Sequence, residues 1–180
     1  PVWLHRGEHF FNDTSVYSCA GAPLFGPDGH CVGMLDLTGI ETAERPELRH
    51  LVAQSARSIE NALALGRPHQ LLLRLNWPGR TLGDDADGLL CLDADGRVTA
   101  ANQTARQMVS QLNRPGGSVH CSELFAMPWE ALFDGARHDA VVEVPLWSGL
   151  RLNALPQAPG QALPPVPRAT PATPRPLPLK

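Results

Sequence analysis

The stretch Ser18–Gly39, SCAGAPLFGPDGHCVGMLDLTG, decides which fold we expect for this chain. It consists of two apolar runs separated by Pro27-Asp28-Gly29. Proline presets φ at the first corner of a tight turn, aspartate bonds its local backbone, and glycine supplies the positive φ that closes a hairpin. The stretch therefore predicts a β-hairpin closed by Gly26 and His30.

A second stretch repeats this design. Gly88–Asn102, GLLCLDADGRVTAAN, turns on Asp95-Gly96, and its strands are expected at 89–93 and 98–101. Asn102 is a good N-cap for a helix in the following TARQMVSQL. Two hairpins, each followed by a helical segment, indicate two small sensory α+β modules rather than one catalytic body.

The return strand of the first hairpin, Cys31–Thr38, is apolar on both sides, which predicts a central strand covered on both faces. Asp36 lies inside it and needs a partner, because burying an unpaired carboxylate is costly. A hydrogen bond to a neighbouring loop is favoured over contact with a ligand. A ligand pocket on this sheet would be lined by Tyr17, Cys19 and Asp36.

A helix is predicted from Pro46 to Leu65, since proline suits a first turn and apolar residues recur at helical spacing. Its expected apolar face consists of Leu48, Leu51, Val52, Ser55, Ile59, Ala62 and Leu63. Gly66-Arg67-Pro68 interrupts the pattern as a boundary or a kink, and HQLLLRL is expected to continue it as a connecting helix. Two interpretations of its leucines stay open: a dimer seam, or packing within the chain.

The rest of the chain predicts a second module and a tail. A brief helix is expected after Pro128, then a strand over 140–152 that Ser148-Gly149 can divide. From Asn153 the proline-rich sequence is expected to be an extended, disordered spacer. The predicted organisation is a partial first domain at 1–65, a connecting helix or linker at 66–80, a second domain at 81–152 and the spacer at 153–180.

Composition excludes several classes of partner. The net charge is −3 and the cationic residues are scattered, so direct nucleic-acid contact by this segment is not expected. No apolar run approaches the ~18 residues of a membrane span, and no signal peptide opens the chain, which predicts a cytoplasmic protein without membrane contact. The sequence begins at Pro1, and we interpret it as a piece of a longer protein.

No motif indicates catalysis or a bound metal. GxxxxGK[ST], HExxH and GxSxG are absent, and the four cysteines form no CxxC. The cysteines are expected to be reduced, buried thiols, with Cys19 opposite Leu37 in the first hairpin. His5 and His9 in HRGEH would share one face only in a helix, whereas Gly7 favours a turn. We predict no catalytic residue, no metal and no cofactor.

Several motifs together resemble a known family. GEHFF, SCAGAP, PDGHCVGMLDLTG and ARSIENAL resemble the later half of the GAF domain in bacterial acetoin-operon-regulator-type proteins, a Fis-family branch of the sigma-54-dependent transcriptional activators. LLLRLN and DDADGLLCLDADGRVTAAN resemble the PAS-like module that follows GAF there. The resemblance covers residues 5–152. The early part of the GAF domain, the ATPase module and the helix-turn-helix of the family have no counterpart in this sequence.

The resemblance implies a fold and a function. The expected fold is the C-terminal half of a GAF-like antiparallel sheet with its helix, a connecting helix, a PAS-like module and the spacer. The expected function is small-molecule sensing by a homodimer, relayed to DNA by a helix-turn-helix outside this chain. The alternative is an interaction or dimerisation module without ligand. A reductase related to GAF domains would need a reactive cysteine, and no cation is placed beside Cys19 or Cys31.

Overall fold

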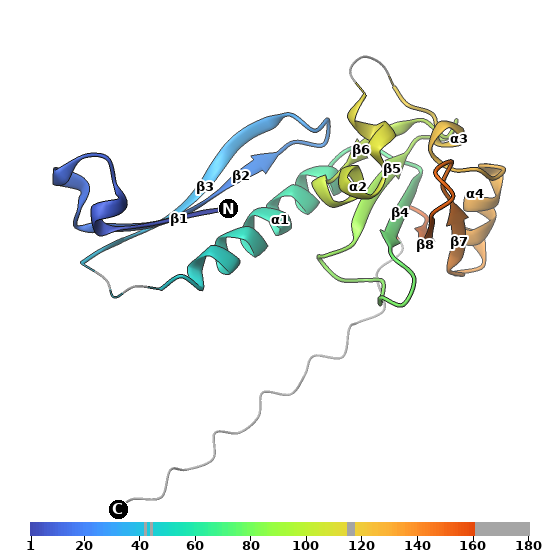
Figure 1. The fold of residues 1–180 in the computed structure, drawn as a ribbon. Coiled ribbons are helices and arrows are strands. Elements are labelled where there is room, and N and C mark those ends of the chain that lie inside the picture. Colours follow the sequence, from blue (N-terminus) through green and yellow to red (C-terminus); the bar gives the residue numbers. More distant parts are fainter. Residues whose placement is uncertain (42, 44, 115–117, 161–180) are drawn as a thin grey trace, which may run out of the picture.

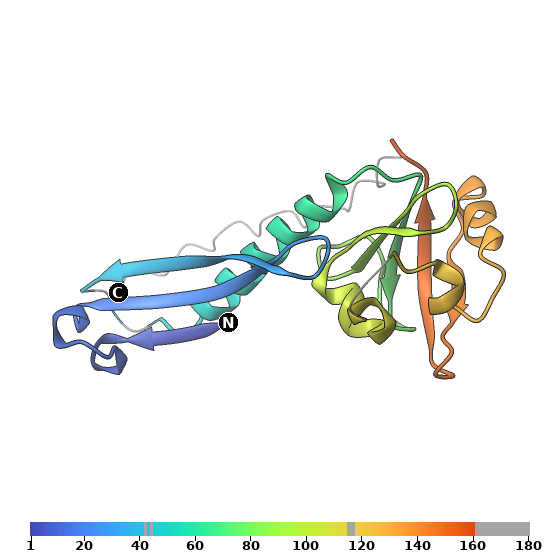
Figure 2. The same cartoon turned by 90° about the horizontal axis from the view of Figure 1, so that it is seen from above.

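The structure is a computed structural model that describes residues 1–41, 43, 45–114 and 118–160. The α+β class is confirmed: two antiparallel sheets lie end to end, and one long helix runs from the first to the second (Figures 1 and 2). The first sheet has the order β1-β2-β3, with strands Val2–His5, Tyr17–Phe25 and Cys31–Ile40. The long helix, α1, spans Leu48–Leu65.

The second sheet has the order β6-β5-β4-β8-β7. Its strands are β4 Leu71–Asn76, β5 Gly88–Leu92, β6 Val98–Ala101, β7 Val142–Pro145 and β8 Arg151–Gln157. The helices between β6 and β7 are α2 Gln103–Met108, α3 Cys121–Leu124 and α4 Glu130–Arg137. Short 3-10 helices lie at Arg6–Glu8, Asn12–Thr14 and Ser110–Asn113. Among the described residues, no helix combines the length and apolarity required to cross a bilayer.

The first hairpin forms as predicted, with one change of register. The Gly26 N–H donates to the His30 carbonyl at 2.8 Å, and Gly29 has a φ of 86°. The pairing shifts by one residue next to the turn, so Cys19 lies opposite Thr38 and not Leu37. A bulge of this kind inserts one unpaired residue, and the turn sequence alone did not reveal it.

The prediction that Cys31–Thr38 is covered on both faces is wrong. β3 is an edge strand, and only the face that contacts α1 is protected by described residues. Leu35 and Leu37 are partly buried there, whereas Met34 on the other face is 70% exposed. An unbroken apolar run permits burial of both faces of a strand, but a second packing element must be present to bury the second face.

The prediction of a connecting helix over 66–80 is also wrong. α1 ends at Leu65, and LLLRLN at 71–76 forms β4, whose six residues are all buried at the centre of the second sheet. A short apolar run between glycine and proline signals fits a buried strand as well as a helix, and periodicity does not separate the two. The pairing of β4 with β5 and β8 decides the outcome.

The chain remains ordered beyond the predicted boundary at Asn153. β8 continues to Gln157 and pairs with β4 throughout 153–157, while β7 pairs only with 151–154. Pro156 therefore lies where β8 has no neighbour on the β7 side, and its missing N–H removes no ladder bond there. Most of the predicted spacer, 161–180, lies outside the described residues.

α1 packs against both sheets, and only part of the predicted apolar face is buried. Its buried residues are Val52, Ala56, Glu60, Asn61 and Ala64. Val52 and Ala56 contact the first sheet, and Ala64 packs on the second sheet. Of the large side chains predicted to lie inward, Val52 is buried and Leu48 is partly buried. Leu51, Ile59 and Leu63 are exposed instead, at 50%, 38% and 41%. The helix approaches both sheets closely, and the small residues Ala56 and Ala64 fit at these contacts.

The second hairpin and its cap are confirmed. Asn102 precedes α2, and its side-chain oxygen accepts from the Ala105 N–H at 2.8 Å, as the N-cap prediction required. The main core of the second sheet lies under α2, α3 and α4 and includes Leu73, Phe125 and Leu132. The strand predicted over 140–152 is divided at Gly149, which has a φ of 86°.

The buried amide of Asn102 joins α1 to the second sheet. Besides capping α2, its oxygen accepts from the Leu89 N–H at 2.9 Å. Its NH₂ group donates to Asn61 Oδ1 at 2.7 Å and to the Asp87 carbonyl at 2.9 Å. One side chain therefore satisfies all of its hydrogen-bonding capacity while it connects a helix, a strand, a loop and α1.

We predict that Asn102→Asp destabilises the protein. The substitution keeps the oxygen that caps α2 but replaces the donor that faces Asn61 and Asp87 with a buried, charged acceptor. The free energy of unfolding should fall by about 2–4 kcal/mol, measured by urea denaturation followed through tryptophan fluorescence. Asn12→Asp, at an exposed position, is the matched control and should change it by about 0.5 kcal/mol or less. Equal stability of the two variants would contradict the role given to the Asn102 amide.

Candidate functional site

The three predicted pocket residues lie on one face of the first sheet. Ser18, Ala20 and Ala22 of β2 are buried toward α1, so the alternating residues Tyr17 and Cys19 point to the opposite side. Asp36 is paired with Gly21, which belongs to the same alternation. We call this side of β1, β2 and β3 the open face.

Polar side chains form a short chain of contacts on the open face. Cys19 Sγ lies 3.5 Å from Thr38 Oγ1, and the Thr38 hydroxyl donates to Asp36 Oδ2 at 2.5 Å. The partner of Asp36 is therefore Thr38 of its own strand. The predicted hydrogen bond to a neighbouring loop is wrong. Thr38 was not singled out by the sequence, although its i+2 spacing from Asp36 places both on one face.

Tyr17 belongs to the same face but lies further along it. It is paired with Ile40, and Cys19 stands between it and the Asp36 row. Four residues of strand separate Tyr17 from Gly21, which corresponds to about 13 Å. The structure thus brings Cys19 and Asp36 together through Thr38, and leaves Tyr17 at the other end of the row.

Apolar residues surround these polar groups. Val2 and Leu4 of β1 are 60% and 37% exposed, and Met34 and Ile40 of β3 are 70% and 65% exposed. Gly21 opens the centre, because a Cβ there would lie 3.6 Å from Met34 Sδ and 3.7 Å from Asp36 Oδ1. The arrangement offers a carboxylate, a hydroxyl and a thiol within an apolar surface, which suits a small polar molecule with hydroxyl or amide donors.

The tip of the first hairpin links this sheet to the second one. The Pro27 carbonyl accepts from the Ala101 N–H at 3.0 Å and from Arg106 Nη2 at 2.8 Å. Behind the tip, the Phe25 N–H donates to Glu60 Oε1 of α1 at 2.8 Å. Burial raises the pKa of Glu60, and the bond from Phe25 opposes that rise. These hydrogen bonds connect β2 and the turn that follows it to α1, β6 and α2.

Two of these linking residues were missed by the sequence analysis. Glu60 is 8% exposed, although a charged side chain favours the solvent-exposed face of a helix. Its spacing of four residues from Ala56 and from Ala64 is the signal that could have located it. Arg106, also 8% exposed, follows the buried Ala105 in α2, and nothing in its sequence context distinguishes it from a solvent-exposed arginine.

The histidines of HRGEH do not form a metal site. The 3-10 helix Arg6–Glu8 replaces the helix that would have aligned them. His5 Nδ1 lies 2.6 Å from Ser18 Oγ, and His9 Nδ1 lies 2.8 Å from the Arg6 carbonyl oxygen. Within the part of the chain that the structure describes, no three His, Cys, Asp or Glu side chains gather as metal ligands.

Comparison with known proteins identifies relatives among bacterial regulators. The chain is 31% identical over 143 residues to the acetoin catabolism regulatory protein of Cupriavidus necator, a match that covers 76% of this chain and 21% of that protein. It is 27% identical over 103 residues to the signal-transduction and transcriptional-control protein of Clostridium beijerinckii, covering 57% of this chain and 16% of that one. The chain thus spans about a fifth of the length of these relatives.

The other comparisons add less. No family model matches the chain. A solved structure described as the crystal structure of the E. coli DhaR(N)-DhaL complex aligns with 87% of this chain and 60% of its own, at 16% identity and a TM-score of 0.33. The sequence relationships confirm the resemblance to bacterial regulators of the acetoin-operon type: this chain is homologous to part of such a protein.

Proposed function

We propose that this chain senses a small molecule through its GAF-like first sheet and relays the signal through its PAS-like second sheet. The observation that supports the proposal best is the open face, where Asp36, Thr38 and Cys19 contact one another within an apolar surround. An effector there would contact β2 and β3, which end at the hairpin tip bound to Ala101 and Arg106. The bound and free states would then differ in how the tip sits on the second sheet.

The proposal extends to the whole regulator. The homologous proteins are named as regulators and not as enzymes. The signal would pass in the cytoplasm to a DNA-binding module outside this chain, and the active species would be a homodimer. The exposed Leu51, Ile59 and Leu63 of α1 offer an apolar stripe for such a dimer.

The alternative is an interaction or dimerisation module without ligand. The same exposed stripe on α1 favours it, because an apolar helix face can serve association alone. The two functions differ in whether any small molecule stabilises the protein through the open face.

A thermal-shift screen of small carbonyl, alcohol and aromatic compounds on the full-length protein tests the sensor. A true effector at about 100 times its Kd stabilises by about 2.7 kcal/mol, which corresponds to a rise in Tm of about 5–10 °C. Asp36→Asn should abolish most of the shift and Tyr17→Phe should reduce it, with little change in the unliganded Tm. Asp13→Asn, at an exposed position, is the control and should keep the full shift. If no compound stabilises the protein, the dimerisation module is the correct function.

The cysteines argue against a reductase. Burial raises the pKa of Cys91 to about 12 and that of Cys121 to about 11, which disfavours the reactive thiolate. Cys31 is exposed, and its Sγ contacts the Gly33 carbonyl. Cys19 contacts the Thr38 hydroxyl. None of these contacts within the described part of the chain supplies a cation that would activate a thiol.

Thiol titration with a chromogenic disulfide provides the corresponding prediction. In the native protein at pH 8, Cys31 should react at about the rate of a free model thiol and Cys19 more slowly, while Cys91 and Cys121 should react only after unfolding. Cys31→Ser should remove the fast phase and nothing else. A native thiol that reacts about tenfold faster than the model thiol would reopen the reductase reading.

A further inference from the structure

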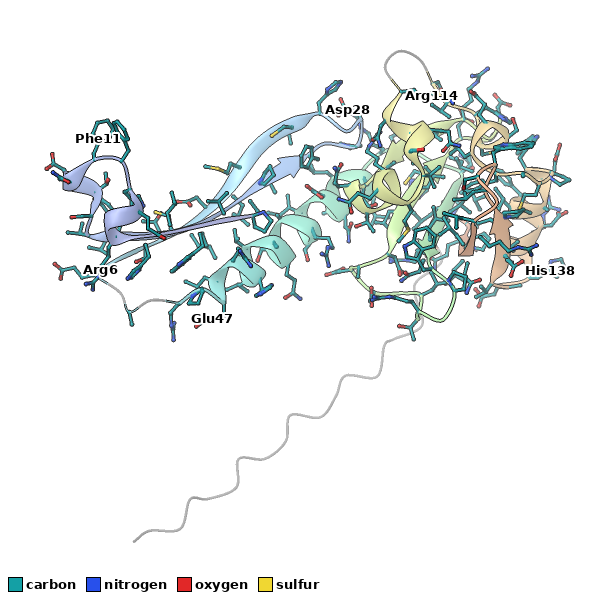
Figure 3. All side chains as sticks on the ribbon, viewed as in Figure 1. Arg6, Phe11, Asp28, Glu47, Arg114 and His138 are labelled. Carbon is teal, nitrogen blue, oxygen red and sulfur yellow. The ribbon has the colours of Figure 1, made fainter. Side chains whose placement is uncertain are left out.

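A cavity of about 510 Å³ lies between the tip of the first hairpin and the second sheet. Its walls are the turn Pro27–His30, residues 98–100 of β6, Arg106 of α2, and residues 112–114 and 118–119. In Figure 3, Asp28 lies at the tip of the first hairpin, on the side that faces Arg114. The cavity is separate from the open face, and it is lined both by the tip of the first hairpin and by residues of β6, α2 and the segments that follow α2.

The cavity follows the outer edge of β6. That edge is capped at one end, where the Val98 N–H donates to the Val119 carbonyl at 2.8 Å, and at the other, where the Ala101 N–H donates to the Pro27 carbonyl at 3.0 Å. Thr99 lies between the two caps, where the pairing of β6 with β5 is irregular. The space between the caps is therefore formed by the strand itself and not by a loosely packed surface.

A buried cation forms part of the cavity wall. The Arg106 guanidinium donates through Nη1 to the Leu112 carbonyl at 2.5 Å and through Nη2 to the Pro27 carbonyl at 2.8 Å, while its buried Nε has no hydrogen-bond partner. Arg106 takes part in none of the ion pairs among the described residues. Two neutral carbonyls thus use only part of its five donors, and no carboxylate neutralises it at contact distance.

This unpaired charge is the anomaly that a ligand would resolve. Buried charges are normally paired, because leaving one uncompensated costs several kcal/mol. Burial lowers the pKa of Arg106, and the nearby Asp28 opposes that effect. The pKa of Asp28 is itself lowered, chiefly by the hydrogen bond from the His30 N–H. Asp28 is fully charged at neutral pH, but it is exposed and already bonded at the turn.

The remaining lining favours an organic anion over a bare inorganic one. Arg114 adds a second positive charge, and Asn113 and Ser118 add polar groups. Val98, Leu112 and Val119 form an apolar part of the wall. Inorganic phosphate has no carbon atoms that could pack against these side chains. A volume of about 510 Å³ also lies within the range of small-molecule sites.

We propose that this cavity binds a small organic carboxylate, with the Arg106 guanidinium as its charge partner, Arg114 as a second cationic contact and the apolar residues against its carbon skeleton. Because the cavity is lined both by the hairpin tip and by β6 and α2, the bound carboxylate fixes the hairpin tip on β6 and α2. The cavity is a second ligand-binding site, independent of the site proposed on the open face.

Calorimetric titration of the full chain with acetate, succinate, citrate and benzoate, at ionic strength held constant with sodium chloride, tests this site. At least one organic carboxylate should bind with saturation. Asp28→Asn removes the only acidic side chain among the described lining residues and should tighten the Kd about two- to fivefold. Asp134→Asn, at an exposed position on α4, is its matched control and should leave the Kd unchanged.

The arginines provide the opposite arm. Arg106→Gln should weaken binding about 30-fold or more, and Arg114→Gln by about two- to fivefold. Arg114 is exposed, so its variant keeps the test valid if Arg106→Gln fails to fold. Arg137→Gln, an exposed arginine on α4, should have no effect. Absence of saturable carboxylate binding, an unchanged Kd in Asp28→Asn, or binding of inorganic phosphate alone would each overturn the proposal.

Discussion

The hydrogen bonds made by the Asn102 side chain are the constraint on which the arrangement of the two sheets depends. The amide is 3% exposed and reaches Asn61 of α1, the start of β5, the loop before it and the first turn of α2. Asn61 extends this network to the loop before β5, because its side-chain amide donates to the Asp85 carbonyl at 3.0 Å. A buried polar network of this kind specifies one geometry, since any other leaves donors or acceptors unsatisfied.

α1 becomes a shared element because of this constraint. Its first half covers the first sheet and its last turn packs on the second, with Glu60 and Asn61 at the point of transfer. The hairpin tip provides a parallel connection through Pro27 and Arg106. Two routes therefore join the proposed sensory face to the second sheet, one through the helix and one through the turn, and the cavity lies beside the second route.

Local chemistry made part of this structure predictable from the sequence. Pro27-Asp28-Gly29 and Asp95-Gly96 specify turns by their backbone preferences, and Asn102 specifies a helix start, so both hairpins and the cap were predicted correctly. The common face of Cys19 and Asp36 did not follow from the predicted register, which placed Leu37 opposite Cys19; the bulge next to the turn brings Asp36 onto the face of Cys19. Tertiary context decided the remainder: β4 required partners on both sides, and Pro156 was tolerated because β7 ends before it. The buried Glu60 and Arg106 likewise depend on contacts with Phe25 and Pro27, which are distant in the chain.

A double-mutant cycle on Asn61 and Asn102 tests most directly whether one buried amide pair joins α1 to the second sheet. The free energies of unfolding of Asn61→Ala, Asn102→Ala and the double variant would be measured by urea denaturation and compared with that of the wild type. The account predicts a coupling energy of about 1 kcal/mol or more, because each single variant already breaks the bond between the two amides. Additivity to within about 0.3 kcal/mol would contradict it.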